Sequence, residues 1–239
     1  MTDLFAPLQD APAYRQIANQ IEQRIVERSL RTGDALPSES DLARQFGVNR
    51  STIREAIREL EIHGLLGRGR GEKRLRVTRP EPRTVSSGVS RALALHDVTF
   101  LELWEAMMAI EPAAAEYAAA RRSTAQLRAL SRAAARFERD SAQTAVAVAA
   151  VTEFFTAVSE ASGNRVLALS QAPLNLLLEA ALTRMIDHVP QARARIQAAQ
   201  EKITAAIKLK KPDQARTWME KHIRDFKRGY DLERLKEPS

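Results

Sequence analysis

Hydrophobic residues recur at helical spacing from the start of the chain. Between Tyr14 and Arg28, apolar side chains at Ile17, Ile21, Ile25 and Val26 are spaced as on one helical face. This spacing predicts an amphipathic helix.

Two shorter amphipathic helices are expected next. Ser38 is a good N-cap for the first, with Asp41 three residues later, and Gly47 can supply the left-handed residue that ends it. Asn49 can cap the second. The apolar face of that second helix is made by Ile53, Ala56, Ile57 and Leu60. Two short helices joined by a tight turn that contains glycine predict a helix-turn-helix.

A glycine-rich basic segment follows directly. We expect a two-stranded wing over residues 64–77, with Leu65 and Leu66 in one strand and Leu75 and Val77 in the other. Six basic residues and one acid lie between positions 68 and 79, which suits close approach to phosphates. A nucleotide-binding phosphate loop is excluded because the segment has neither Walker spacing nor a strand–loop–helix context.

The polar face of the predicted second helix of the helix-turn-helix is rich in arginine and hydroxyl groups. Its members are Arg50, Ser51, Thr52, Arg54 and Arg58. In a major groove, arginine can pair with guanine and hydroxyl groups can reach phosphates or bases. Basic residues on a helix face are often only solvated, but the basic wing that follows favours a DNA-reading face.

The rest of the chain predicts a second domain. Prolines and small residues at 80–88 predict a linker, and the pattern is then almost wholly helical to Leu235. We expect a mainly α protein with a DNA-binding domain at 1–79, a linker at 80–97 and an all-helical domain at 98–239.

Composition narrows the possible functions. Of 239 residues, 37 are Lys or Arg and 30 are Asp or Glu, a basic balance that is compatible with a polyanion partner without proving one. The lack of cysteine excludes disulfides and zinc–thiolate sites. No signal sequence or run of about 18 apolar residues occurs, which predicts a cytoplasmic protein. No Ser-His-Asp, Cys-His or paired-carboxylate arrangement is present, so we expect no enzyme.

Residues 14–77 resemble a known family. The segments 36–43, 47–57 and 60–66 closely resemble the DNA-binding domain of the GntR family of transcription regulators. The resemblance implies a dimer that reads a pseudo-palindromic operator. It also implies that the operator contacts come from Ser40, Arg50, Ser51, Thr52, Arg54, Arg70 and Gly71.

The helical part resembles the FadR subgroup of that family, whose FCD-type ligand domain is an antiparallel helical bundle. The resemblance rests on weaker motifs at 101–103, 110–112, 161–164, 205–207 and 212–223. It implies that this domain dimerises and binds a small-molecule effector, either an organic acid or a larger apolar acyl-type ligand.

Many members of the subgroup hold a divalent metal with one Asp and three His, and this chain departs from that pattern. The Asp and first two His positions fall on Val151, Phe155 and Gln200, and only His222 is retained. The arginine that often binds the effector's acid falls on Met107. One imidazole beside apolar groups cannot make a metal site, so no metal or cofactor is expected.

The substitutions leave a more apolar candidate effector pocket. Its predicted residues are Met107, Glu111, Val151, Phe155, Gln200 and His222. Either the pocket takes a bulkier, less charged effector, or side chains fill it and the domain only dimerises. The sequence therefore favours a repressor controlled by an effector. The alternative is an architectural DNA-binding protein that has no effector.

Overall fold

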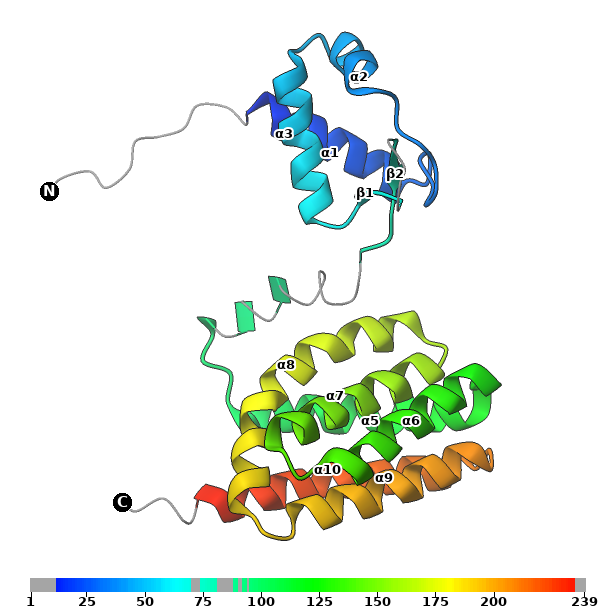
Figure 1. Cartoon of the computed structure of the whole chain (residues 1–239), viewed down its shortest axis with the longest axis vertical. Coiled ribbons are helices and arrows are strands. Elements are labelled where there is room, and N and C mark those ends of the chain that lie inside the picture. Colours follow the sequence, from blue (N-terminus) through cyan, green and yellow to red (C-terminus); the bar gives the residue numbers. More distant parts are fainter. Residues whose placement is uncertain (1–11, 70–73, 81–87, 90–91, 94, 235–239) are drawn as a thin grey trace, which may run out of the picture. The chain divides into compact units, whose positions relative to one another are not determined.

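The computed structural model describes residues 12–69, 74–80, 88–89, 92–93 and 95–234. The chain divides into two compact units, Met1–Val85 and Ser86–Ser239. Within the described ranges, helices dominate both units, and the sheet has two strands (Figure 1). The expected mainly α fold, with a small β-wing in the N-terminal unit, is confirmed.

The N-terminal unit consists of three helices and the wing. The helices are α1 (Ala13–Val26), α2 (Glu39–Phe46) and α3 (Arg50–Ile62). Strands β1 (Leu66–Arg68) and β2 (Leu75–Val77) pair antiparallel, with Leu66 opposite Val77. Leu65, which we expected inside the strand, lies just before it.

Local signals explain why α2 and α3 form two helices. The Ser38 hydroxyl accepts a hydrogen bond from the Asp41 backbone amide at 3.2 Å and donates one to its carboxylate at 2.6 Å. Gly47 has a φ of 67°, the left-handed conformation that ends α2. Asn49 occupies the N-cap of α3, but its side chain caps no amide in the part of the chain described.

One apolar position of α1 was assigned to the wrong face. Ile17 and Ile21 are buried, but Val26 is 73% exposed. With 3.6 residues per turn, a residue nine positions after Ile17 lies about 180° around the helix from it. Val26 therefore points away from the core, which includes Ile53, Leu60 and Val77.

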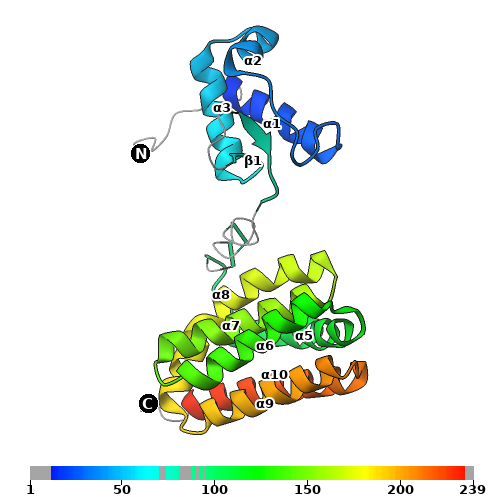
Figure 2. The same cartoon turned by 45° about the vertical axis from the view of Figure 1, so that its right-hand side comes forward.

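The C-terminal unit is a bundle of long helices that lie side by side (Figures 1 and 2). Its described helices are α5 (Phe100–Arg121), α6 (Thr124–Asp140), α7 (Thr144–Ala161), α8 (Arg165–His188), α9 (Ala192–Lys208) and α10 (Pro212–Arg234). Capping boxes at Thr99–Glu102 and Ser123–Gln126 begin α5 and α6.

The bundle is held by a continuous apolar core and by a few long-range hydrogen bonds. Leu103, Phe154 and Ile207, from three different helices, belong to the same buried cluster. The indole Nε1 of Trp104 donates to the carbonyl of Ile223 at 3.0 Å, which joins α5 to α10. These contacts fix the inner faces of the helices, where the candidate effector residues lie.

Two bundle helices are long and apolar enough to cross a membrane by length and composition alone. They are Thr144–Ala161 and Arg165–His188, with mean hydropathies of 1.3 and 1.4 over an 18-residue window. Core helices of globular bundles meet the same criterion. Half of the window in α7 and a third of that in α8 are buried inside the bundle, and the buried part includes Val151 and Phe155 of α7 and Leu178 and Leu182 of α8.

Candidate nucleic-acid interface and candidate effector site

The outer face of α3 and the start of α2 present the predicted operator residues. Ser40, Arg50, Ser51 and Arg54 are exposed, while Thr52 is half-buried. Arg70 and Gly71, predicted for the wing tip, lie outside the described residues. Ile53 and Ile57, on the opposite face of α3, are buried. Rotating the helix would expose these apolar side chains, so Arg50 and Arg54 stay on the solvent side.

An acidic residue that the sequence analysis did not single out lies against these arginines. The Glu39 carboxylate accepts a hydrogen bond from Arg54 Nε at 2.8 Å, and Arg50 lies 3.8 Å away. Glu39 follows the N-cap of α2 and is 15 residues before Arg54, so helical periodicity could not reveal the pair. This ion pair orients Arg54 in the protein without DNA. Because the pair is exposed to solvent, it contributes little stability and is easily broken.

The start of α3 can also bind an anion through its backbone. The first amides of a helix have no partners within the helix, and the helix dipole favours negative charge there. Since the Asn49 side chain caps none of them within the described structure, the amides are free to meet a phosphate.

The described part of the wing is tied to the rest of the unit. The Leu36 amide donates to the Leu75 carbonyl at 2.9 Å, and the Arg76 guanidinium donates to the Gly33 carbonyl at 2.9 Å. Arg68, on β1, pairs with Glu61 at 3.2 Å. These ties hold β1 and β2 against α3 and against the loop between α1 and α2. Arg74, just before β2, and Arg79, just after it, are exposed.

All six predicted effector residues lie in the interior of the bundle. They come from α5, α7, α9 and α10, and each is at most 2% exposed. They are Met107, Glu111, Val151, Phe155, Gln200 and His222.

Aromatic rings pack around His222 in the interior of the bundle. Its imidazole stacks on Phe155 at 5.8 Å between ring centroids and lies 4.5 Å from Phe226. Phe155 and Phe226 also meet edge to face at 5.9 Å. This packing fits the interpretation that side chains fill the position of the family's metal.

Several buried polar atoms in this interior make no hydrogen bond within the described structure. Both carboxylate oxygens of Glu111, both amide atoms of Gln200 and Nε2 of His222 are buried without a partner among the described residues. Burial alone lowers the pKa of His222 to about 3. Burial also raises the pKa of Glu111 to about 8. The nearby Gln171 side chain lowers this pKa in part, although its contact with the carboxyl group does not have hydrogen-bond geometry. Both side chains are therefore neutral near pH 7.

The residues at the family's metal position do not fit a metal ion. Val151 and Phe155 offer no ligand atom, and Gln200 and His222 supply a single good ligand nitrogen between them. Among the described residues, no group of three or more His, Asp or Glu side chains could hold an ion.

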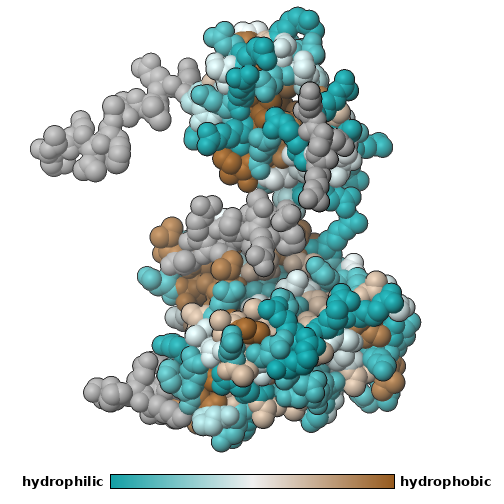
Figure 3. Space-filling model, in the orientation of Figure 1, coloured by the Kyte–Doolittle hydropathy of each residue, from teal (hydrophilic) through white to brown (hydrophobic). Residues whose placement is uncertain are grey.

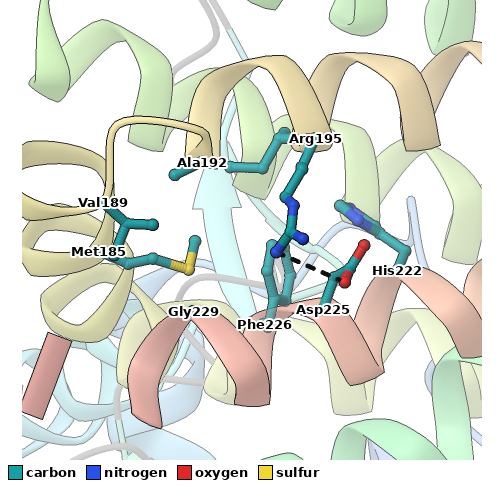
Figure 4. A pocket seen from close by; sticks show the side chains of 9 residues that line it. Met185, Val189, Ala192, Arg195, His222, Asp225, Phe226 and Gly229 are labelled. Carbon is teal, nitrogen blue, oxygen red and sulfur yellow. Dashed lines mark ion pairs between the residues drawn. The ribbon is translucent and has the colours of Figure 1, made fainter. Parts of the chain in front are cut away.

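A small cavity lies beside His222, between α8, α9 and α10. Figure 4 shows Arg195, from α9, reaching toward Asp225 of α10, with 3.9 Å between the charged atoms. A volume of about 10 Å³ has room for roughly one water molecule. Gly229 packs so closely on Met185 that a β-carbon there would clash.

Comparisons with known proteins agree with this geometry. The family described as bacterial regulatory proteins, gntR family, matches residues 13–73, and the FCD domain matches residues 102–225.

Two curated relatives cover different parts of the chain. The transcriptional repressor NanR of Cronobacter sakazakii is 28% identical over 225 residues, which are 91% of this chain and 85% of the relative. MngR, the mannosyl-D-glycerate transport/metabolism system repressor of Escherichia coli, is 53% identical over 49 residues, only 20% of each protein.

A solved structure has the same fold. The GntR protein of Streptococcus agalactiae superposes with a TM-score of 0.63 at 24% identity, covering 90% of this chain and 99% of that one.

Proposed function

Because the chain belongs to the GntR family of bacterial regulators and carries an FCD domain, we propose that it is a dimeric repressor that reads a two-fold operator and is released by an effector. The family binds DNA through its helix-turn-helix and regulates transcription, and it is not a family of enzymes. The relatives named as repressors favour repression over activation. Such a protein works in the cytoplasm.

The observation that carries the proposal is the outward face of α3. Arg50, Ser51 and Arg54 are exposed at the N-terminal end of a helix whose other face is fully buried. In helix-turn-helix proteins the residues near the N-terminal end of the recognition helix contact base edges. Only a partner that displaces Glu39 from Arg54 gains full use of that guanidinium, and a DNA base edge or phosphate can do so.

An exposed apolar stripe on α8 supports the dimer. Val166 and Leu176 are 71% and 49% exposed, and Leu169 lies on the same face between them. In the space-filling view, hydrophobic surface of the C-terminal unit lies among hydrophilic residues (Figure 3). Apolar side chains that recur along one helix face lose their contact with water when a second copy covers them, and a two-fold dimer matches a two-fold operator.

The unpartnered atoms of Glu111 and Gln200 support an effector inside the bundle. Buried polar groups without partners are costly, and a ligand that supplies their hydrogen bonds gains from satisfying them. The effector acts if it binds the DNA-competent and DNA-incompetent arrangements with different affinities.

A second candidate is an architectural DNA-binding protein whose bundle only dimerises. The aromatic packing of Phe155, His222 and Phe226 favours it, because these rings occupy space that an effector would need.

Replacing Arg54 tests the DNA-reading role. If Arg54 pairs with a base, Arg54→Ala weakens binding to the chain's own promoter by about 1–3 kcal/mol and leaves binding to shuffled duplex nearly unchanged. Fluorescence anisotropy with the two duplexes measures both affinities. Arg128→Ala, an exposed arginine on α6, is the matched control and changes neither. An equal loss of affinity for both duplexes would show that Arg54 contacts a phosphate and does not read a base.

A further inference from the structure

One carboxylate serves both arginines at the N-terminal end of α3. Oε2 of Glu39 lies 2.8 Å from Nε of Arg54 and 3.8 Å from Nη2 of Arg50. Arg58, one turn after Arg54 and also exposed, makes no ion pair within the described residues. The acid is therefore placed at the end of the helix that is proposed to read bases.

Glu39 is held in place more firmly than the arginines that it pairs with. Its side chain is 27% exposed, against 64% for that of Arg54. Glu39 is the first residue of α2, and the hydrogen bonds of the Ser38 cap fix the backbone there. The dipole of α2 favours a negative charge at this end of the helix. A partner that draws the guanidinium away therefore still meets the carboxylate beside it.

The ion pair divides the hydrogen-bond donors of Arg54 into two sets. Nε is engaged by Glu39, while the terminal Nη1 and Nη2 groups have no partner within the described residues. Two parallel donors of this kind match the O6 and N7 acceptors of a guanine edge. A guanine edge can therefore bind Arg54 while the pair with Glu39 persists.

A phosphate is a different kind of acceptor, because it carries a full negative charge. When it approaches Arg54 it also approaches the Glu39 carboxylate, and the two like charges repel each other. A guanine edge has no net charge and meets no such repulsion. With Glu39 beside it, Arg54 thus favours neutral acceptors over anionic ones.

We propose that Glu39 is a specificity-determining residue, which keeps Arg54 from acting as a phosphate contact on random DNA and leaves it free to read a guanine in the operator. Non-specific binding comes almost wholly from phosphate contacts, so weakening one of them lowers the affinity for random sequence and spares the base contact. This inference rests on the proposed function, since it requires α3 to face DNA. Glu39 acts through Arg54 and is a positioning residue.

Glu39→Gln tests the proposal, because it removes the charge and keeps an oxygen that can accept from Nε of Arg54. We expect the variant to bind shuffled duplex about fivefold more tightly than the wild type does, with a salt dependence steeper by about one phosphate contact. Its preference for the chain's own promoter falls by about the same factor. Fluorescence anisotropy with both duplexes at several salt concentrations measures these quantities. An unchanged preference, or a preference lost only through weaker promoter binding, overturns the proposal.

Two further variants show whether the effect is local. Glu27→Gln, at the exposed C-cap of α1, removes the same charge from the same unit and should change neither affinity. If it tightens shuffled duplex as much as Glu39→Gln does, a general charge effect replaces the proposal. In an Arg54→Ala background, Glu39→Gln should lose most of its effect on shuffled duplex. If the full effect remains there, Glu39 does not act through Arg54 and the proposal is overturned.

The wild type in the same experiment separates this inference from the proposed function. A wild type that binds promoter and shuffled duplex equally would refute the proposed function itself. A wild type that prefers its promoter, with the same preference in Glu39→Gln, would refute only the role of Glu39 and leave the regulator intact.

Discussion

At the residue scale, two buried ionisable groups have pKa values shifted in opposite directions. Glu111 has a pKa raised to about 8 and His222 a pKa lowered to about 3, and burial is the main cause of both shifts. A carboxyl group with a raised folded pKa makes the fold less stable as pH rises from the unfolded value to the folded one. An imidazole with a lowered pKa makes the fold less stable as pH falls. Their combined contribution is most favourable between the two unfolded values, near pH 5 to 6.

Glu111→Gln tests the alkaline half of this behaviour. Between about pH 5 and pH 8 the wild type should lose several kcal/mol of unfolding free energy relative to the variant, since each unit of pKa shift is worth about 1.4 kcal/mol. Urea unfolding at a series of pH values measures the difference. Parallel curves for the two proteins would mean that Glu111 ionises in the folded state as readily as in water.

His222→Phe tests the acid half, because phenylalanine keeps a ring against Phe155 and Phe226 without a titratable nitrogen. From about pH 6.5 down to pH 3 the wild type should lose stability faster than the variant. The same urea series gives the answer. An equal loss in both proteins would show that His222 takes up a proton while folded.

Residues differ in how far the sequence reveals them. The Ser38 cap and the left-handed Gly47 were predictable because each acts within a few neighbours. The Glu39–Arg54 pair was not, since it depends on how two helices cross. The missing partners of Glu111 and Gln200 depend on packing from several helices, which no spacing encodes.

At the element scale, local sequence patterns predict the wing strands and the helices of the N-terminal unit. Val26, at the end of α1, is the exception, because it was expected on the buried face and is exposed. The apolar residues of α8 are harder to assign from sequence. Periodicity shows that the helix is apolar on more than one side, and only the packed bundle shows which side is left uncovered.

Leu176→Glu tests whether a second copy covers α8. A charge in the middle of an apolar interface is costly, so the variant should dissociate to monomers at concentrations where the wild type is a dimer. Sedimentation velocity measures the mass of each. Leu209→Glu is the control, because Leu209 is also an exposed leucine but follows α9, and this variant should stay dimeric. A dimeric Leu176→Glu protein would move the interface elsewhere.

At the scale of the whole molecule, the proposed function joins a DNA-binding unit to a helical unit that we propose binds an effector and dimerises. The first is supported by its local structure and by its family. The second has the fold of its family, but its interior chemistry differs from the metal-holding pattern at Val151, Phe155 and Gln200.

The most direct test of the central claim is the affinity of the full chain for its own promoter region compared with shuffled duplex of the same composition, at one fixed salt concentration. A repressor that reads base sequence should prefer its promoter by about a thousandfold or more, with two chains per site. Equal affinity for the two duplexes would contradict the account, because the outward face of α3 would then hold DNA without reading it.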